Sequence, residues 1–541
     1  MQRLALLAAA IPLIAAAPAP DPVSPESLSA DVKVLASDAF GGRAPGTAGE
    51  AKTIDWLVGQ FRAAGLEPGG RGGGWTQDVP LIRTRLGKGG VAVNGTALVP
   101  GTDIYLSTVR PVDRATIART PMVFVGYGVT APERQWDDFK GVDLKGKVAV
   151  FLVNDPDFEA VVGEPAAGRF GDRRMTYYGR WTYKFEEAAR RGAIAALIVH
   201  DTAGAGYGWN TVVAPAGENY DVANPRSPRV LLQGWLEGAA ATRLFAGAGL
   251  DLAKLRLQAR QADFRPVAIP GTGFTADLPV TVTRATSRNV LAKVTGRVRP
   301  NQVVMYGAHW DAYGEGAPDA EGRRIRPGAN DDALGVAGVL AIARAAAKAP
   351  AARTQVFALW TGEERGLLGS ETYAADPIYP AATTVANLTL DILQTAGPAR
   401  DVMLVGDGQN TLEDMLRTAA TAQGRTVTPE ALPERGLFYR ADHFSVARRG
   451  VPTLLLMAIS GAPDLVEGGR DGGQAWLDGY MRCYHQTCDA WSADWDLRGA
   501  AADVGLIGSV GTTLANGAMW PDWKQGSEFR AIRAKTAAAR R

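Results

Sequence analysis

The second half of the sequence contains histidines and carboxylates that stand just beyond predicted strands or in loops that lead into helices. This set consists of His309, Asp311, Asp331, Asp332, Glu363, Glu364, Asp391 and His485. The working groups of α/β sheets sit at the carboxyl ends of the strands, so these side chains are expected to converge at one sheet edge. The chain has only four histidines, and two of them belong to this set. The sequence therefore predicts a functional site built from imidazole and carboxylate groups.

Each residue of this set has an ordinary structural role when it is taken alone. An acidic residue before a helix is commonly an N-cap, and acidic residues in a first turn are favoured by the helix dipole. Several carboxylates at one edge, however, repel one another and raise their pKa values unless cations compensate. Two divalent metal ions supply that compensation, and imidazole and carboxylate ligands with an open position suit catalytic zinc. The combination favours a zinc centre.

Alternating strands and helices must position these residues. The predicted strands are 290–294, 303–306, 356–360, 388–390, 402–405 and 453–456, and the predicted helices are 336–347, 367–375 and 412–422. This order indicates an α/β fold, a three-layer sandwich around a central mixed, mostly parallel sheet. Upstream, residues 26–64 are predicted to be helical around a turn at 43–47, and residues 76–115 to form strands and turns.

The middle of the chain carries few groups that could do chemistry. Strands are predicted at 123–129, 148–153 and 194–199, with a helix near 183–191. Its one histidine, His200, closes the third strand, and we assign it a structural or solvated role. We expect residues 118–265 to be an inserted non-catalytic module. The catalytic domain then consists of residues 21–117 and 266–541.

The length and composition are those of an ordinary globular protein with more than one domain. Its 541 residues are too many for a single hydrophobic core. The chain is 46% hydrophobic and 21% charged, which is close to average. A net charge of +2 gives no basic footprint of the kind that nucleic-acid binding requires, so no nucleic-acid partner is expected.

The first 20 residues are predicted to be a signal peptide. Arg3 precedes an apolar run over residues 4–17, and small residues at 15–17 offer a cleavage site. The alternative is an uncleaved membrane anchor, for which the run is short. No later stretch is long and apolar enough to cross a bilayer. We therefore expect export to the periplasm or the medium, with no integral membrane segment after signal removal.

The chain has two cysteines, Cys483 and Cys488. Export would allow them to form a disulfide. A loop of about six residues would contribute only ~2 kcal/mol through chain entropy. The alternative is a zinc-binding pair, which lacks the second pair of cysteines that such sites use.

Ordered motifs run through the second half of the chain: His309-Trp310-Asp311, segment 327–332, segment 361–370 around Glu363-Glu364, and segment 387–391. Together they resemble the motifs of the co-catalytic di-zinc aminopeptidase family, which includes glutamate carboxypeptidases and glutaminyl cyclases. Segment 483–489 is especially similar to a disulfide-bearing turn of the bacterial secreted aminopeptidases. The resemblance covers residues 285–515 well and 30–115 loosely. The middle unit resembles an inserted, β-rich protease-associated domain.

The resemblance implies a metal centre of two Zn2+ ions. The implied ligands are Asp331, which would bridge the ions, His309 and Asp391 at one site, and Glu364 and His485 at the other. It also implies a cis peptide bond after the bridging aspartate, and a disulfide between Cys483 and Cys488.

The resemblance implies further roles around the metals. Glu363 would be the general base, Asp311 would hold His309 in one tautomer, and Tyr484 would donate a hydrogen bond to the oxyanion. Arg440 matches an arginine that meets a carboxylate of the substrate or product. His443 resembles a histidine that is not a ligand, because His485 takes that place.

These roles indicate a secreted zinc metallopeptidase, an aminopeptidase that acts on peptides with a free amino end. Three alternatives remain at this point. A carboxypeptidase of the same family would keep the metals and add a basic pocket. A glutaminyl cyclase would work with one zinc ion. A non-enzymatic ectodomain on this scaffold would typically lack ligands.

Overall fold

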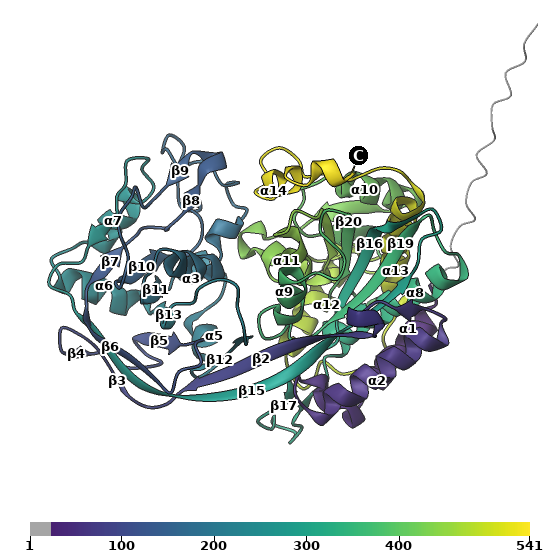
Figure 1. Ribbon diagram of the computed structural model, residues 1–541, viewed down its shortest axis with the longest axis horizontal. Coiled ribbons are helices and arrows are strands. Elements are labelled where there is room, and N and C mark those ends of the chain that lie inside the picture. Colours follow the sequence, from purple (N-terminus) through teal and green to yellow (C-terminus); the bar gives the residue numbers. More distant parts are fainter. Residues whose placement is uncertain (1–22, 541) are drawn as a thin grey trace, which may run out of the picture.

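A long mixed sheet forms the centre of the larger lobe, on the right in Figure 1. The computed structural model describes residues 23–540. Along this sheet the strands lie in the order β12 (Glu218–Val222), β2 (Thr76–Leu86), β15 (Phe274–Val294), β19 (Arg353–Trp360), β16 (Arg299–His309), β20 (Thr384–Leu390) and β23 (Thr453–Leu456). Strands β19, β16, β20 and β23 are parallel, and β15 pairs antiparallel with β19.

Both faces of the parallel strands are apolar, because alternate residues point to opposite sides and helices cover each side. On β16, Tyr306 packs in the core of one face and Met305 in the core of the other. The first face is covered by α1 (Pro25–Leu35), α2 (Ala48–Ala63), α8 (Leu334–Lys348), α10 (Leu412–Ala422) and α13 (Arg498–Asn516). The second is covered by α9 (Leu368–Ala375) and α11 (His443–Ala447). The predicted three-layer α/β fold is confirmed.

The predicted helical segment at the N-terminus consists of two helices with a turn between them. Side-chain oxygens of Ser24 and Thr47 accept hydrogen bonds from backbone N–H groups in the first turns of α1 and α2. Such caps fix where the two helices begin. The intervening turn, with glycines at 41 and 42 in positive φ, places the side chain of Arg43 in the interior.

Residues 402–405 contribute to a strand, but this strand lies outside the central sheet. Strand β21 (Asp401–Leu404) pairs with β22 (Thr426–Pro429) in a separate parallel sheet. The Asp401 carboxylate accepts hydrogen bonds from Thr428 at 2.6 Å and Arg470 at 2.7 Å. A short apolar segment indicates a strand, whereas its partner is chosen by tertiary packing.

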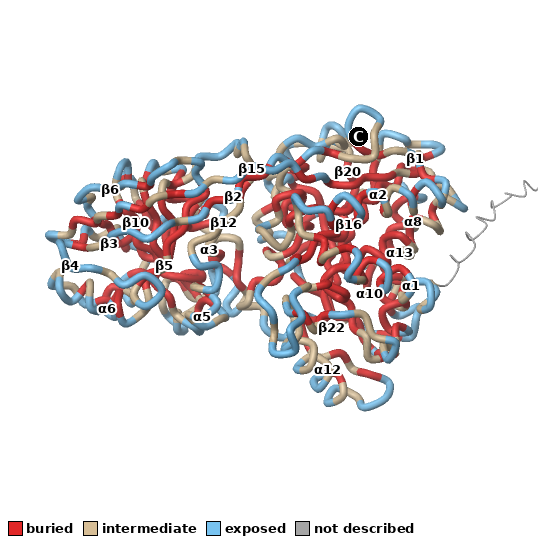
Figure 2. Tube along the Cα trace, turned by 90° about the horizontal axis from the view of Figure 1, so that it is seen from below, coloured by how far each residue is buried: buried red, intermediate tan, exposed pale blue. Residues whose placement is uncertain are grey.

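The smaller lobe, on the left in Figure 1, contains a second sheet. Its strands lie in the order β14 (Val267–Ala268), β7 (Met122–Phe124), β10 (Val148–Leu152), β11 (Ala195–Val199), β13 (Leu232–Leu236) and β5 (Ile104–Ser107). Strands β7, β10, β11 and β13 are parallel. Helices α3 (Trp181–Arg190), α6 (Gly238–Gly247) and α7 (Leu252–Gln258) accompany them. Figure 2 shows a buried core in each lobe.

The two lobes share the long strand β15. Its residues 274–279 pair with β3 (Gly90–Val93) and β6 (Arg114–Thr120). Residues 280–290 pair with β2, and residues 290–294 pair with β19. The core of the smaller lobe draws apolar residues from positions 91–117 and 274–280 as well as from the segment between them. The assignment of residues 118–265 to an inserted protease-associated domain stays a prediction.

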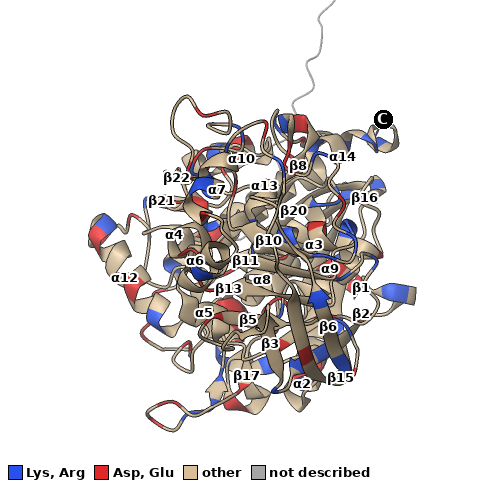
Figure 3. Ribbon diagram, turned by 90° about the vertical axis from the view of Figure 1, so that its left-hand side faces the viewer, with Lys and Arg blue, Asp and Glu red and all other residues tan. Residues whose placement is uncertain are grey.

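The predicted signal peptide, residues 1–20, lies outside the described residues. Across positions 23–540, no helix combines the length and apolar character that crossing a bilayer requires. Figure 3, a ribbon coloured by residue type, shows Lys and Arg positions interspersed with Asp and Glu positions along the chain.

Candidate metal centre

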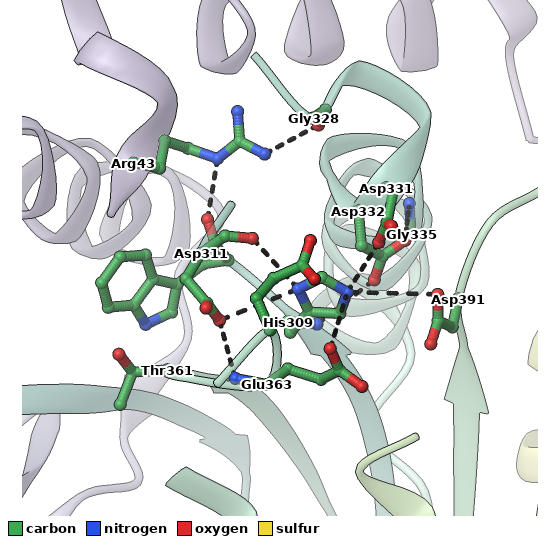
Figure 4. Close-up of polar contacts among 12 residues, drawn as sticks. Arg43, His309, Asp311, Gly328, Asp331, Asp332, Gly335, Thr361, Glu363 and Asp391 are labelled. Atoms are coloured by element: carbon green, nitrogen blue, oxygen red, sulfur yellow. Dashed lines mark hydrogen bonds and ion pairs between the residues drawn. The ribbon is translucent and has the colours of Figure 1, made fainter. Parts of the chain in front are cut away.

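The carboxyl ends of neighbouring parallel strands bring predicted residues together, and the close-up in Figure 4 shows this for His309, Asp331, Glu363 and Asp391. His309 is the last residue of β16, and Asp391 follows β20 directly. Glu363 and Glu364 stand in the loop after β19. Asp331 lies in the turn that leads into α8. Because β16 lies between β19 and β20, their C-terminal loops open at one edge of the sheet.

One group of potential metal ligands contains His309, Asp331 and Asp391. The Nε2 atom of His309 lies 3.0 Å from Oδ1 of Asp331 and 4.0 Å from Oδ1 of Asp391. Ligand atoms of all three residues lie within 4.8 Å of one another, and all three are buried. Two carboxylates and one imidazole at these spacings could hold a divalent cation.

A second group contains Asp331, Glu364 and His485. His485 follows α12 (Gly469–Cys483). Its Nε2 atom lies 3.1 Å from Oδ2 of Asp331 and 3.2 Å from Oε2 of Glu364. Asp331 therefore directs one carboxylate oxygen to each group.

The buried carboxylates of these groups disfavour one another's ionised forms. Burial, with the negative charges of Asp331 and Glu363, raises the pKa of Glu364 well above its ordinary value. Burial also raises the pKa of Asp391 to about 7. For Asp331, hydrogen bonds from the two histidines outweigh burial and lower the pKa. Buried carboxylates this close together are stabilised in their ionised form by a positive charge, which bound metal ions would supply.

Glu363 is close to the first group but is anchored differently. Its Oε2 atom lies 3.9 Å from Nε2 of His309, and its backbone N–H donates to Oδ1 of Asp311 at 3.1 Å. Burial raises the pKa of Glu363 well above its ordinary range. The side chain belongs to neither three-residue group.

Asp311 contacts His309 mainly through its backbone. The Nδ1 atom of His309 lies 3.1 Å from the carbonyl oxygen of Asp311, and 3.7 Å from its carboxylate. A proton on Nδ1, donated to this carbonyl, would leave the Nε2 lone pair available to a metal ion held beside the carboxylates. The carboxylate of Asp311 instead receives the Glu363 N–H, so Asp311 connects the loops after β16 and β19.

Two further aspartates hold the loop that carries Asp331. Asp489 accepts hydrogen bonds from the backbone N–H groups of Asn330 at 2.9 Å and Asp331 at 3.1 Å. Asp332 accepts them from His309 at 3.2 Å and Gly335 at 3.0 Å. The Asp331–Asp332 peptide bond is cis, as predicted. Sequence reasoning assigned no role to Asp489, although it ends the predicted disulfide turn.

Arg43 is a buried residue whose role sequence reasoning missed. Its guanidinium donates to the carbonyl oxygens of Trp310 at 2.7 Å, Pro327 at 2.6 Å and Gly328 at 2.7 Å. These carbonyls flank the segments that carry His309 and Asp331. Burial lowers the pKa of Arg43 to about 10. Its position in a turn between two helices was the only signal in the sequence.

The predicted disulfide between Cys483 and Cys488 is present. It encloses Tyr484 and His485, whose rings lie 3.6 Å apart between centroids. The ring of Tyr313 also packs against His485, with 4.5 Å between the ring centroids. The bridge thus constrains the segment that carries one potential ligand.

Replacing both cysteines by serine should reduce peptidase activity more than it reduces global stability. The short loop contributes only ~2 kcal/mol through chain entropy, but it orients Tyr484 and His485. We expect at least a ~10-fold loss of kcat/KM, with a small change in the midpoint of denaturant unfolding. Unchanged kinetics in the double variant, or two free thiols found by mass spectrometry in the active protein, would contradict this role.

A cavity of about 340 Å³ opens beside the two groups. Glu363, Glu364, His485, Tyr484 and Arg440 all line it. Burial raises the pKa of Tyr484 well above its ordinary value, which keeps the phenol protonated.

His443 lies outside both groups. It is fully buried, it contacts the Phe438 ring at 4.6 Å, and burial lowers its pKa to about 3. A neutral packed histidine agrees with its expected lack of a metal-binding role.

Residues 289–506 match the family model described as peptidase family M28. This part of the chain is therefore similar to peptidase family M28. The matched M28 region contains both potential ligand groups and Glu363. It excludes most of the smaller lobe. The resemblance inferred from the motifs is therefore confirmed.

Proteins named as peptidases are among the relatives of this region. Leupeptin-inactivating enzyme 1 of Streptomyces exfoliatus is 29% identical over 236 residues, which is 42% of this chain and 49% of that protein. Leucine aminopeptidase 2 of Trichophyton equinum is 29% identical over 174 residues, 31% of this chain and 32% of that protein. The matches span half or less of these relatives' lengths.

A solved structure resembles nearly the whole chain. The aminopeptidase from Aneurinibacillus sp. strain AM-1 aligns with a TM-score of 0.51 at 20% identity, and covers 92% of this chain and 95% of that chain. At this identity the similarity shows the fold alone, and the activity has to be argued from the site.

Proposed function

We propose that this protein is an exported zinc aminopeptidase that holds two zinc ions. The observation that carries the proposal is the pair of three-residue groups that share Asp331, one oxygen facing each. His309 and Asp391 would complete one metal site, and Glu364 and His485 the other. Imidazole with carboxylate ligands suits zinc, and three protein ligands leave a position for water or substrate.

The bound ions would supply an acidified water and a positive charge next to the scissile carbonyl. The chain's own groups would handle the protons. Glu363 is close to the first group without belonging to it, so its carboxylate can accept a proton from water and pass it to the leaving amine. Tyr484, protonated and on the cavity wall, can donate a hydrogen bond to the developing oxyanion.

The acidic character of the site supports recognition of a free amino end. An α-ammonium group needs carboxylates close to the scissile bond, and Glu363 and Asp391 are placed to accept it. Asp442 adds a third buried carboxylate close enough for its charge to act on Glu363. Several relatives are named as aminopeptidases, which agrees with cleavage from the amino end.

Export is supported by two features of the chain. The first 20 residues have the pattern of a signal peptide, and the Cys483–Cys488 bridge is of a kind that persists outside the cytosol. Residues 118–265 are proposed to be the inserted protease-associated module, and Arg180, Trp181 and Arg229 from this segment line the same cavity as the potential ligands.

Peptides with a free amino end should be hydrolysed at least ~10-fold faster than amino-acetylated copies, because acetylation removes the charge that pairs with the carboxylates. Initial rates on one peptide in both forms, with an apolar first residue, measure the difference. Equal rates, or release of residues from the carboxyl end first, would favour a carboxypeptidase instead.

A further inference from the structure

Strand β12 has one edge that no other strand covers. It is the first strand of the central sheet and pairs with β2 on one side, and no strand among residues 23–540 pairs with its other side. It comes from the segment 118–265, whereas the potential metal ligands come from the larger lobe. Figure 1 shows β12 beside β2, where the two lobes meet. Such an edge presents unpaired backbone groups to an extended chain that lies beside it.

The register with β2 shows which backbone groups of β12 face the free edge. Before the strand, the N–H of Leu86 donates to the carbonyl oxygen of Gly217 at 3.0 Å. After it, the N–H of Ala223 donates to the carbonyl oxygen of Pro80 at 2.8 Å. Hydrogen-bonded pairs alternate along an antiparallel ladder, so the odd-numbered residues from 217 to 223 face β2. The N–H and C=O groups of the even-numbered residues between them point to the free edge.

Side chains of β12 itself satisfy these outward N–H groups. The N–H of Tyr220 donates to Oδ1 of Asn219 at 2.9 Å, and the N–H of Val222 donates to Oδ1 of Asp221 at 2.8 Å. Each bond runs from one residue to the side chain of the residue before it, and neither involves a second segment of the chain. The edge therefore keeps its donors satisfied when it is empty, and an incoming strand can replace both contacts.

The free edge borders the cavity of about 340 Å³ beside the metal centre. The Arg365 guanidinium lies 5.0 Å from the centre of the Tyr220 ring and 4.8 Å from that of the Tyr313 ring. The Tyr313 ring in turn packs against His485 of the second ligand group. All four residues line this cavity. Two side chains thus separate Tyr220 of β12 from a potential metal ligand.

A second cavity, of about 580 Å³, continues along the same edge. Val222 and residues 224–227 line it. Ser227, Arg229 and Glu371 line both cavities, so the two adjoin. An extended chain laid along β12 passes from the metal-side cavity into the larger one. Because Tyr220 lies on the first cavity and Val222 on the second, a chain with its amino end at the metal centre runs parallel to β12.

Resting on the proposed function, we propose that the free edge of β12 binds the peptide substrate as an added parallel strand. The substrates are then extended, unfolded peptides of about five residues or more, because about three strand residues are needed to pass Tyr313 and Arg365. Main-chain hydrogen bonds hold such peptides with little regard to the side chains beyond the first residues. Segment 118–265 contributes substrate binding, and the larger lobe carries out the chemistry.

Peptide length and backbone methylation test the added strand. The substrates are carboxyl-terminal amides with leucine first and alanine at every later position. We expect kcat/KM for release of leucine to rise at least ~10-fold between two and six residues, as two or more hydrogen bonds predict. In hexapeptides with one N-methyl group, moved from residue 3 to residue 6, kcat/KM should fall about 3-fold or more at alternate positions only, because every second N–H of a strand faces its neighbour. A flat length series would overturn the proposal, and so would methylation effects that do not alternate.

Val222→Pro removes one outward N–H and leaves the hydrogen bonds to β2 in place, and proline is accepted at such positions of edge strands. The ratio of kcat/KM between the hexapeptide and the dipeptide should fall at least ~3-fold. The matched control Val222→Ala keeps the N–H and should keep the ratio. Circular dichroism checks that the proline variant is folded, and if it is not, the methylation series on the unaltered enzyme decides. Equal ratios in all three folded proteins would contradict the proposal.

Binding separates this proposal from the proposed function. Calorimetric titration of the methylated hexapeptides into the Glu363→Gln protein measures affinity without hydrolysis. Alternating losses of affinity, with no hydrolysis by the unaltered enzyme, would support the strand site and contradict the peptidase proposal. Hydrolysis that depends on neither length nor methylation would overturn the strand site alone. A dimer in light scattering that Val222→Pro converts to a monomer would also overturn it, because the edge would then join two copies of the chain.

Discussion

Replacing Glu363 by glutamine should reduce kcat by at least ~100-fold while the zinc content stays nearly unchanged. Glutamine keeps the shape of the side chain but cannot accept the proton of the attacking water. The backbone hydrogen bond from Glu363 to Asp311 does not depend on the side chain, so the loop should keep its position. Steady-state kinetics and metal analysis of the same preparation measure both quantities.

The neighbouring variant Glu364→Gln is the matched control. Its side chain lies 3.2 Å from His485 in the second ligand group, so the loss of its charge should release about one metal ion per chain. The two variants should therefore differ in metal content although they change adjacent residues in the same way. Identical metal content in both variants would refute the assignment of Glu363 as the general base and Glu364 as a metal ligand.

Removal of metal by a strong chelator should abolish activity, and added zinc should restore it. The five potential ligands lie in two groups, so the restored protein should contain two zinc ions per chain. The metal-free protein should also unfold at a lower temperature, because ions that bind only the folded state stabilise it. Without them the crowded carboxylates repel one another or take up protons.

Metal analysis and thermal unfolding of the same samples decide between the alternatives. A single zinc ion at full activity would favour the one-metal chemistry of a cyclase. Full activity in a preparation shown to be free of metal would exclude the mechanism altogether. The His485→Ala variant, which removes a ligand from one group only, should retain the ion held by His309, Asp331 and Asp391.

The sequence by itself predicted the main strands and several helices of the larger lobe, and the acidic and histidine residues that meet at one edge of its sheet. Continuous apolar segments such as 303–306 are long enough and β-branched enough to be read as buried strands. The acidic residues that follow them need compensating charge wherever they meet, which made a metal centre predictable. The disulfide was predictable because Cys483 had one possible partner, Cys488.

Contacts between distant segments could not be predicted in this way. Arg43 lies 267 residues from Trp310, whose carbonyl it binds, and nothing in its local sequence specifies that contact. Strand β21 was expected from its composition, but its separate sheet was not, because pairing depends on which edges are free. The contribution of β3, β6 and β15 to the core of the smaller lobe could not be predicted either, because it depends on the same long-range pairing.

Only the tertiary structure brought the two lobes to one cavity. Arg180 and Arg440 both line that cavity, although they are 260 residues apart in the sequence. Local sequence thus determined which side chains were candidates for a metal centre, whereas long-range packing decided which of them meet and what else lines the cavity beside them.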